Sequence, residues 1–241
     1  MQKGFHEPGE KPRRFYKAVD VRPGEGGFQV LLDGRSPRSA KGAKLSAPTE
    51  ALAQMLAEEW AAQGEFIDMQ VMAATRLAFT ALEAIPPARD AVAQQFADYA
   101  GSDLICYFAE EPAALVQRQE EHWGPVLDRA EQELALAFVR AAGIRHQAQP
   151  ETTLATVKAL ALESDDFGLA GLAFGAPLFG SAILTLALQK GWLTAEQAHA
   201  LSRVDEAYQE EKWGIDDEAA ERTARLLEES KMLARWFRAL D

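Results

Sequence analysis

The sequence predicts an α+β protein, with a small N-terminal antiparallel β domain over residues 1–47 and a larger all-helical domain over residues 48–241. Two observations carry this prediction. Before residue 47, closely spaced turn signals separate short apolar runs, as they do in hairpins. From Pro48 onward, apolar residues recur instead with the 3.6-residue period of helices.

The β domain is predicted from its turns. An extended segment at 14–21 runs into Pro-Gly-Glu-Gly-Gly at 23–27, and a second at 28–32 runs into Asp33-Gly34. Both turn sequences favour tight reversals, and the second is typical of a two-residue hairpin. Residues 1–11 are expected to be a mobile lead-in. Because so small a sheet buries little apolar surface, we expect it to pack on the helical part of the chain.

The helical domain is predicted from apolar stripes and from the glycines and prolines between them. The first stripe comprises Leu52, Met55, Leu56 and Trp60. Ser46 or Thr49 would cap that helix. Further helices are expected at about 71–84, 88–101, 112–121, 125–142, 151–163, 181–190, 194–213 and 216–240. Trp60 and Trp236 belong to apolar stripes and are expected in the core.

The segment Phe167–Leu188 carries no charge over a length that can span a bilayer. It is interrupted at Gly168, Gly171, Gly175, Pro177 and Gly180. These residues break helices, so we expect the helix itself at roughly Ser181–Lys190, buried and closely approached by the glycine-rich part. Asp165-Asp166 resembles a helix start. No stable membrane insertion is predicted.

Charge excludes several partners. The net charge is −12, and it is uneven, with +4 on residues 1–50 and −16 on the remainder. An acidic body repels phosphate backbones, so no nucleic acid partner is expected. Its helices also lack the basic faces that adsorb to membranes. The start has no apolar signal core, which favours a cytoplasmic protein or an already mature organellar form.

The sequence contains no motif for dinucleotide, P-loop, serine-hydrolase or zinc-protease chemistry. Its histidines have no partners at metal-ligand spacing. The single cysteine, Cys106, excludes an internal disulfide, and its apolar neighbours predict a buried side chain rather than a nucleophile. We therefore predict no catalytic residue, no metal and no cofactor.

The candidate site is the segment Leu201–Gly214. Helical spacing places Leu201, Val204 and Tyr208 on a core-facing stripe with Asp205 at its rim. An adjacent, outward face comprises Glu206, Gln209, Glu210 and Trp213. A tryptophan among acids either packs on the next helix or serves as an exposed anchor for a partner. Periodicity alone leaves these two interpretations equal.

A series of short motifs in fixed order adds a further indication. They are Arg14-Phe15-Tyr16-Lys17, Leu32-Asp33-Gly34-Arg35, Glu59-Trp60, Asp103-Leu104 with Cys106-Tyr107, Gln119, Trp123 with Pro125, Gly180-Ser181, and Ser202–Gln209 followed by Trp213-Gly214. Together they resemble the family of F-type ATP synthase assembly chaperones that act on the alpha subunit.

The resemblance implies a non-enzymatic protein that binds the unassembled alpha subunit of the catalytic head and protects its beta-facing surface until assembly. A subunit without its neighbours exposes apolar surface, which is an aggregation hazard. The family's important acidic position falls on Asp205 or Glu206. The expected partner-binding residues are thus Asp205, Glu206, Gln209, Glu210 and Trp213. The expected location is the bacterial cytoplasm, or the mitochondrial matrix for a mature eukaryotic form.

Two other functions remain open from the residues alone. A hydrolase would need two carboxylates of the acidic face to converge in a concave pocket with raised pKa values. A scaffold would bind an already assembled complex and migrate with it.

Overall fold

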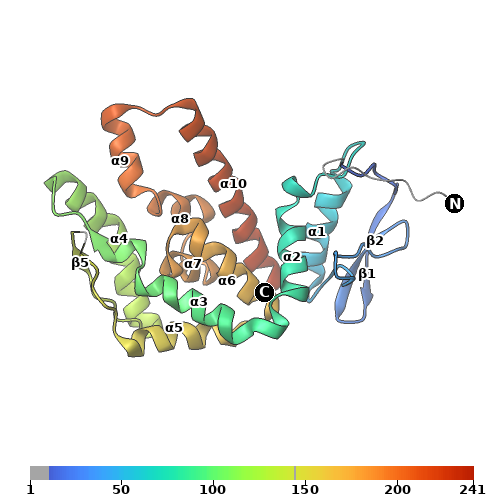
Figure 1. The fold of residues 1–241 in the computed structure, drawn as a ribbon, viewed down its shortest axis with the longest axis horizontal. Coiled ribbons are helices and arrows are strands. Elements are labelled where there is room, and N and C mark those ends of the chain that lie inside the picture. The colour runs from blue at the N-terminus through green and yellow to red at the C-terminus, as the bar shows by residue number, and fades with distance from the viewer. Residues whose placement is uncertain (1–10, 144) are drawn as a thin grey trace. The chain divides into compact units, whose positions relative to one another are not determined.

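Figure 1 shows the computed structural model of the chain, which describes residues 11–143 and 145–241. Residues 1–10, most of the expected lead-in, lie outside the described residues. Antiparallel strands come first and helices follow, so the predicted α+β class is confirmed. The described residues divide into two units, residues 11–79 and residues 80–239.

The first unit contains a three-stranded sheet in the order β1-β2-β3. Strands β1 (Val19–Gly24) and β2 (Gly27–Leu32) form an antiparallel hairpin, and β3 (Ser46–Ala47) pairs with β2. The hairpin turn requires glycine: Gly27 has φ of +119°, and a Cβ there would lie 2.3 Å from the Ala47 carbonyl oxygen. The predicted antiparallel β unit is confirmed.

Helix α1 (Glu50–Ala61) packs on this sheet, as expected for a sheet too small to stand alone. It begins where Thr49 Oγ1 accepts a hydrogen bond from the Leu52 N–H at 3.1 Å, and its predicted stripe is buried. After the short helix η1 (Met69–Val71), α2 (Ala73–Glu83) begins. The Glu59 carboxylate accepts from the first N–H groups of α2, Ala74 at 2.8 Å and Thr75 at 2.7 Å.

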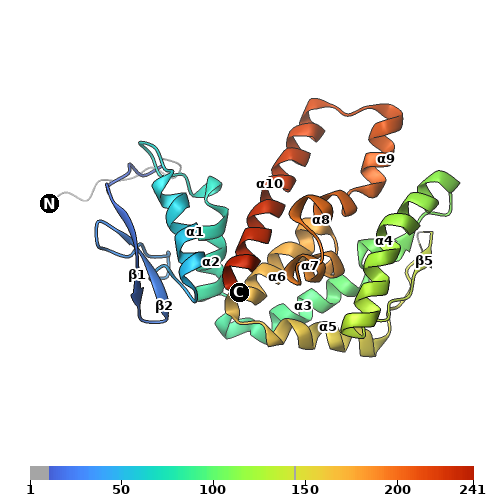
Figure 2. The same ribbon diagram turned by 180° about the vertical axis from the view of Figure 1, so that it is seen from behind.

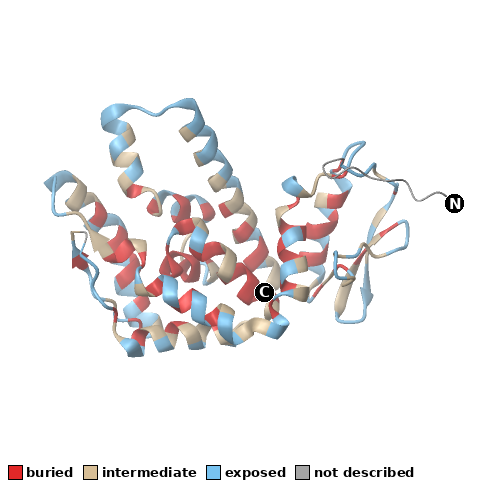
Figure 3. Cartoon of the chain, viewed as in Figure 1, coloured by how far each residue is buried: buried red, intermediate tan, exposed pale blue. Residues whose placement is uncertain are grey.

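The second unit is mainly helical. Its elements are η2 (Pro86–Ala88), α3 (Arg89–Gly101), η3 (Leu104–Cys106), β4 (Tyr107–Phe108), α4 (Ala113–Leu134), β5 (Ala141–Ala142), α5 (Glu151–Glu163), α6 (Asp166–Phe179), α7 (Ala182–Gln189), α8 (Ala195–Leu201), α9 (Val204–Trp213) and α10 (Asp217–Leu240). Figure 3 shows that α6 and α7 are largely buried, and the predicted helix at 181–190 is indeed buried throughout Ala182–Leu188.

Helix α6 corrects one prediction, because its glycines and Pro177 do not interrupt it. The glycines serve packing instead. A Cβ on Gly171 would lie 2.6 Å from the Phe237 ring, and one on Gly175 would lie 2.4 Å from the Thr185 methyl group. Close approach of α10 and α7 thus stabilises a helix that local propensity disfavours. Within the described ranges, no helix combines the length and hydropathy of a membrane span.

Helix α4 corrects a second prediction. It runs unbroken from Ala113 to Leu134 through Pro125, where a break was expected. A proline removes one hydrogen bond, and the burial of Trp123 and Leu127 on either side offsets that loss. The expected helix at 125–142 is also too long, since Ala135 with φ of +55° ends it. The residues beyond instead form β5, which pairs in parallel with β4, a pair the sequence did not indicate.

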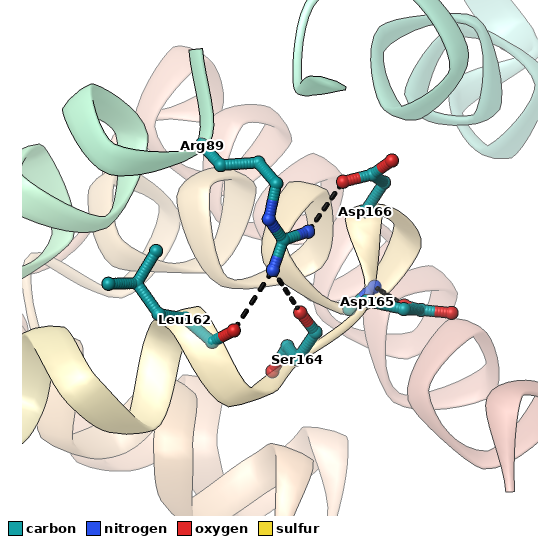
Figure 4. A network of polar contacts seen from close by, with 6 residues as sticks. Arg89, Leu162, Ser164, Asp165 and Asp166 are labelled. Carbon is teal, nitrogen blue, oxygen red and sulfur yellow. Dashed lines mark hydrogen bonds and ion pairs between the residues drawn. The ribbon is translucent and has the colours of Figure 1, made fainter. Parts of the chain in front are cut away.

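Arg89, at the start of α3, ties three helices together (Figure 4). Its guanidinium donates to the carbonyl oxygens of Leu162 at 2.9 Å and Ser164 at 2.7 Å, and to the Asp166 carboxylate at 2.5 Å. Asp165 caps α6 by accepting from the Gly168 N–H at 2.6 Å, so the predicted helix start is confirmed. The link between α5 and α6 is thereby fixed against α3.

Candidate partner-binding surface

The surface is carried by α9, whose direction is set by a break that the sequence did not indicate. The expected helix at 194–213 is in fact two helices, α8 and α9. At the break, Ser202 Oγ donates to the His199 carbonyl at 2.8 Å, and the Arg203 N–H donates to the Ala200 carbonyl at 3.2 Å. Figures 1 and 2 show α9 leaving α8 and joining α10 through a short link at its far end.

The inner stripe of α9 lies as the helical spacing predicts. Leu201 and Val204 are buried, and Tyr208 is half-buried. Two cations contact the Tyr208 ring: the Arg118 guanidinium carbon lies 5.3 Å and the Lys212 ammonium 5.4 Å from its centroid. Such contacts contribute roughly 0.5–1 kcal/mol each at exposed sites.

Asp205 sits at the rim, held by a buried amide. The Gln119 side chain is 1% exposed, and its Oε1 accepts from the Ala109 N–H at 2.7 Å. Its Nε2 donates to Asp205 Oδ1 at 2.6 Å. The backbone contact fixes which way the amide points, so Gln119 presents a donor to Asp205 and orients that carboxylate.

A second anchor joins α9 to α4. The Arg118 guanidinium donates to both carboxylate oxygens of Glu211, at 2.7 and 2.8 Å. This planar, two-bond geometry is the one that gives exposed ion pairs a defined direction. It also holds the pKa of Glu211 below its usual range, through the hydrogen bond from Arg118. Helix α9 is thus fixed to α4 at both Asp205 and Glu211.

The outward face contains most of the residues expected there. Glu206, Gln209 and Trp213 are exposed, and Trp213 is 80% exposed. Glu210 differs from them: it is half-buried and accepts from Arg203 at 2.6 Å, a residue whose side chain is only 12% exposed. Its carboxylate is therefore already engaged at the start of α9.

The tip between α9 and α10 is apolar in an acidic setting. Trp213 ends α9, Gly214 turns the chain with φ of +83°, and Ile215 follows with 48% of its surface exposed. Asp216 then caps α10 by accepting from the Ala219 N–H at 2.8 Å. Two large apolar side chains are thus presented to solvent at one end of a helical arm.

Two features bear on catalysis, the lack of a metal-binding group among the described residues and the burial of Cys106. Within the described parts of the chain, no group of His, Cys, Asp and Glu residues is arranged to hold a metal ion. Cys106 is fully buried, as predicted, and burial raises the pKa of its thiol, with the neighbouring Asp103 adding to the effect. A thiol kept protonated in an apolar setting is a poor nucleophile.

Comparison with known proteins decides the family. Residues 13–131 match the family described as ATP12 chaperone protein. The crystal structure of Atp12 from Paracoccus denitrificans is 41% identical, with a TM-score of 0.89, and the match covers 95% of this chain and 99% of that one. The chain belongs to the ATP12 chaperone family. The resemblance drawn from the motifs is thereby confirmed.

Other ATP12 relatives agree. A variant of the same Paracoccus denitrificans protein, with an aspartate replaced by lysine, is 40% identical over 95% of this chain and 98% of that one, with a TM-score of 0.89. A protein from Agrobacterium tumefaciens is 40% identical over 95% and 87% of the two chains, with a TM-score of 0.91. Protein atp12, mitochondrial, of Schizosaccharomyces pombe is 25% identical over 221 residues, 87% of this chain and 76% of that protein.

Sequence reasoning missed the anchors of this ATP12 chain. Arg118 and Glu211 stand 93 positions apart, and Gln119 and Asp205 stand 86 apart, so helical spacing says nothing of either contact. Gln119 was available as a motif residue, but only as part of the resemblance. Glu211 had no signal beyond its place in an acidic run.

Proposed function

We propose that this ATP12-family chaperone of ATP synthase assembly binds the unassembled alpha subunit of the catalytic head and protects its beta-facing surface until assembly. The proposed contact residues are Asp205, Glu206, Gln209, Glu210 and Trp213. The observation that carries the proposal is the exposure of Trp213. Its side chain is 80% exposed at the end of α9, a helix that Arg118 and Gln119 hold against α4.

Trp213 has the properties of a binding anchor. Tryptophan dominates the energetics of many interfaces when it enters a partner's pocket within a polar rim. Here Glu206 and Gln209 supply exposed polar groups on the same helix. An alpha subunit that lacks its neighbours offers apolar surface of the kind that such an anchor covers.

The helix is also prepared for binding before a partner arrives. Because Arg118 holds Glu211 and Gln119 holds Asp205, α9 is positioned in the free chain. Less ordering is then needed on association, which favours affinity. Three of the four carboxylates of α9 contact separate partners, Gln119, Arg203 and Arg118, and this supports a binding role over a paired acid–base site.

The proposal needs no cofactor and no nucleic acid. The proposed location is the bacterial cytoplasm, or the mitochondrial matrix for a mature eukaryotic form, since the relatives include bacterial proteins and one named mitochondrial.

A capture experiment tests the proposal. The tagged chain is mixed with unassembled alpha or beta subunit, or with intact synthase, and the bound material is quantified. We expect capture of alpha alone. Trp213→Ala should weaken it by roughly 2 kcal/mol or more, the range of interface anchors. Phe15→Ala is the matched control, because Phe15 is 73% exposed but lies in the first unit.

Three outcomes contradict the proposal. Capture of beta in place of alpha would refute the client. Capture of intact synthase but not of free subunits would favour a scaffold. Equal effects of Trp213→Ala and Phe15→Ala on alpha capture would refute the surface. Glu206→Lys gives a second readout, since an exposed interface charge should change binding with little effect on thermal stability.

A further inference from the structure

An open, solvent-accessible cavity of about 1010 Å³ lies beside α9 on the side that faces β4. Its lining includes Tyr107, Phe108, Glu110, Glu111, Gln119 and Asp205. These residues come from β4, the segment after it, α4 and α9, all within the second unit. Asp205 thus belongs both to the helix of the proposed contact surface and to a concave site.

The cavity is lined by carboxylates that form no ion pair among the described residues. Glu110 and Glu111 are exposed and Asp205 is half-buried, and none of the three takes part in an ion pair among the described residues. Asp205 Oδ1 accepts from Gln119, a neutral donor. Three carboxylates therefore line one space, and none of them has an ion-pair partner among the described residues.

These acids do not form a metal-binding group. No cluster of three acidic or other ligating side chains close enough to share a metal ion occurs within the described ranges. Carboxylates that line one cavity but stand too far apart for a common metal suit a larger cation with several donors. An arginine guanidinium has five N–H donors in a planar fork, and lysine has three on a long stem.

The walls are preformed and partly aromatic. The Phe108 ring packs edge-on against Trp123, with centroids 5.6 Å apart, and the Tyr107 hydroxyl lies 3.1 Å from His146 Nδ1. The Glu110 carboxylate lies against Gly143, where a Cβ would come within 2.9 Å of it. Aromatic faces next to carboxylates favour guanidinium groups, through cation–π contact combined with charge-assisted hydrogen bonds.

We propose that this cavity receives an extended, arginine-bearing segment of the client protein. The inference rests on the proposed function, and it adds the chemistry that the client must present next to α9. Charge complementarity selects the occupant, since three carboxylates without an ion-pair partner among the described residues line the cavity, in a chain whose residues after 50 carry −16. Gln119 acts as a positioning residue, because it orients Asp205 at the cavity wall.

A peptide titration tests the charge requirement. The probe is a fluorescein-labelled peptide, Gly-Arg-Gly-Arg-Gly, and its control replaces both arginines with citrulline, which keeps the shape and removes the charge. Anisotropy with the full chain should give at least about tenfold tighter binding of the arginine peptide, the scale of one close charge pair. Equal binding of the two peptides would overturn the inference.

Matched variants locate the binding. Glu110→Gln combined with Glu111→Gln should remove most of the arginine preference, and Asp205→Asn should reduce it further. Glu131→Gln combined with Glu221→Gln changes the net charge equally at exposed positions outside the cavity and should keep the preference. A preference lost equally in both double variants would place the binding elsewhere and refute the cavity.

Capture of the alpha subunit separates the two proposals. If the Glu110/Glu111 double variant captures alpha as well as the Glu131/Glu221 control does, the cavity proposal fails and the proposed function stands. If the unaltered chain captures no alpha, the proposed function fails, and the peptide titration alone decides whether the cavity selects arginine. Loss of capture in the cavity variant only, with unchanged thermal stability, supports both.

Discussion

Replacing Gly175 with alanine tests whether the glycines of α6 are there for packing. The added methyl would lie 2.4 Å from Thr185 Cγ2 and 2.9 Å from Leu233 Cδ2. Carbon atoms in contact normally stay about 3.5–4.0 Å apart, so the shortfall exceeds an ångström. Thr185 cannot easily turn aside, because it is fully buried and its hydroxyl donates to the Ser181 carbonyl at 2.7 Å.

Two opposing effects set the magnitude. Alanine gains up to about 1 kcal/mol over glycine inside a helix. Overpacking a filled core costs about 1–3 kcal/mol, and a clash of this depth against a fixed side chain belongs at the upper end. We expect Gly175→Ala to lower the free energy of unfolding by about 2 kcal/mol, which corresponds to a fall in Tm of about 4–8 °C for a chain of this size.

Gly101→Ala is the matched control. Gly101 ends α3, and a Cβ there meets only Leu154 Cδ1 at 3.9 Å, an ordinary contact. The same chemical change should therefore leave Tm unchanged or raise it slightly. Thermal unfolding followed by circular dichroism measures both variants. If Gly175→Ala is as stable as Gly101→Ala, glycine at 175 is not required by packing, and our explanation of α6 is wrong.

Three further predictions concern buried groups. Trp60→Ala should lower the free energy of unfolding by roughly 3–5 kcal/mol in chemical denaturation. Trp60→Phe should cost much less than Trp123→Phe. The Trp60 indole N–H has no hydrogen-bond partner, whereas that of Trp123 donates to the Leu201 carbonyl at 2.9 Å. Burial raises the pKa of Asp103 to about 7, so the folded chain holds this proton more tightly than the unfolded chain. The contribution of Asp103 to the free energy of unfolding is therefore largest below pH 4 and decreases as pH rises towards 7. The Tm of the unaltered chain minus that of Asp103→Asn, measured from pH 4 to 8, should decrease as pH rises, because only the unaltered chain loses this contribution. A pH-independent difference would refute the assignment. Cys106 should react with a thiol reagent only on unfolding, and rapid modification of the native chain would contradict its burial.

Local signals account for the parts of the fold that the sequence predicts well. The hairpin between β1 and β2 follows from glycine-rich turn chemistry, and α1 follows from Thr49 and the stripe ending at Trp60. In each case the determining residues are neighbours in the chain. The outward position of Trp213 follows in the same way from helical spacing.

The errors arise where tertiary packing overrides propensity. Helix α6 persists through three glycines and Pro177 because α7 and α10 approach it closely, and α4 persists through Pro125 because Trp123 is buried beside it. Helix α4 ends at Ala135, a residue that rarely adopts a left-handed conformation, so its end had no local signal. Of the site, the contacts from Arg118 and Gln119 depend on α4 meeting α9, which only the fold reveals.

The tip of the arm formed by α9 and α10 has a consequence for the behaviour of the chaperone in a crowded solution. An exposed tryptophan beside an exposed isoleucine would ordinarily make copies of a protein adhere to one another. Here Trp213 and Ile215 are followed at once by Asp216, Asp217 and Glu218, on a chain with a net charge of −12. Each copy therefore meets another with electrostatic repulsion at the point where adhesion would begin. This repulsion opposes self-association while the apolar tip is exposed in the free chain.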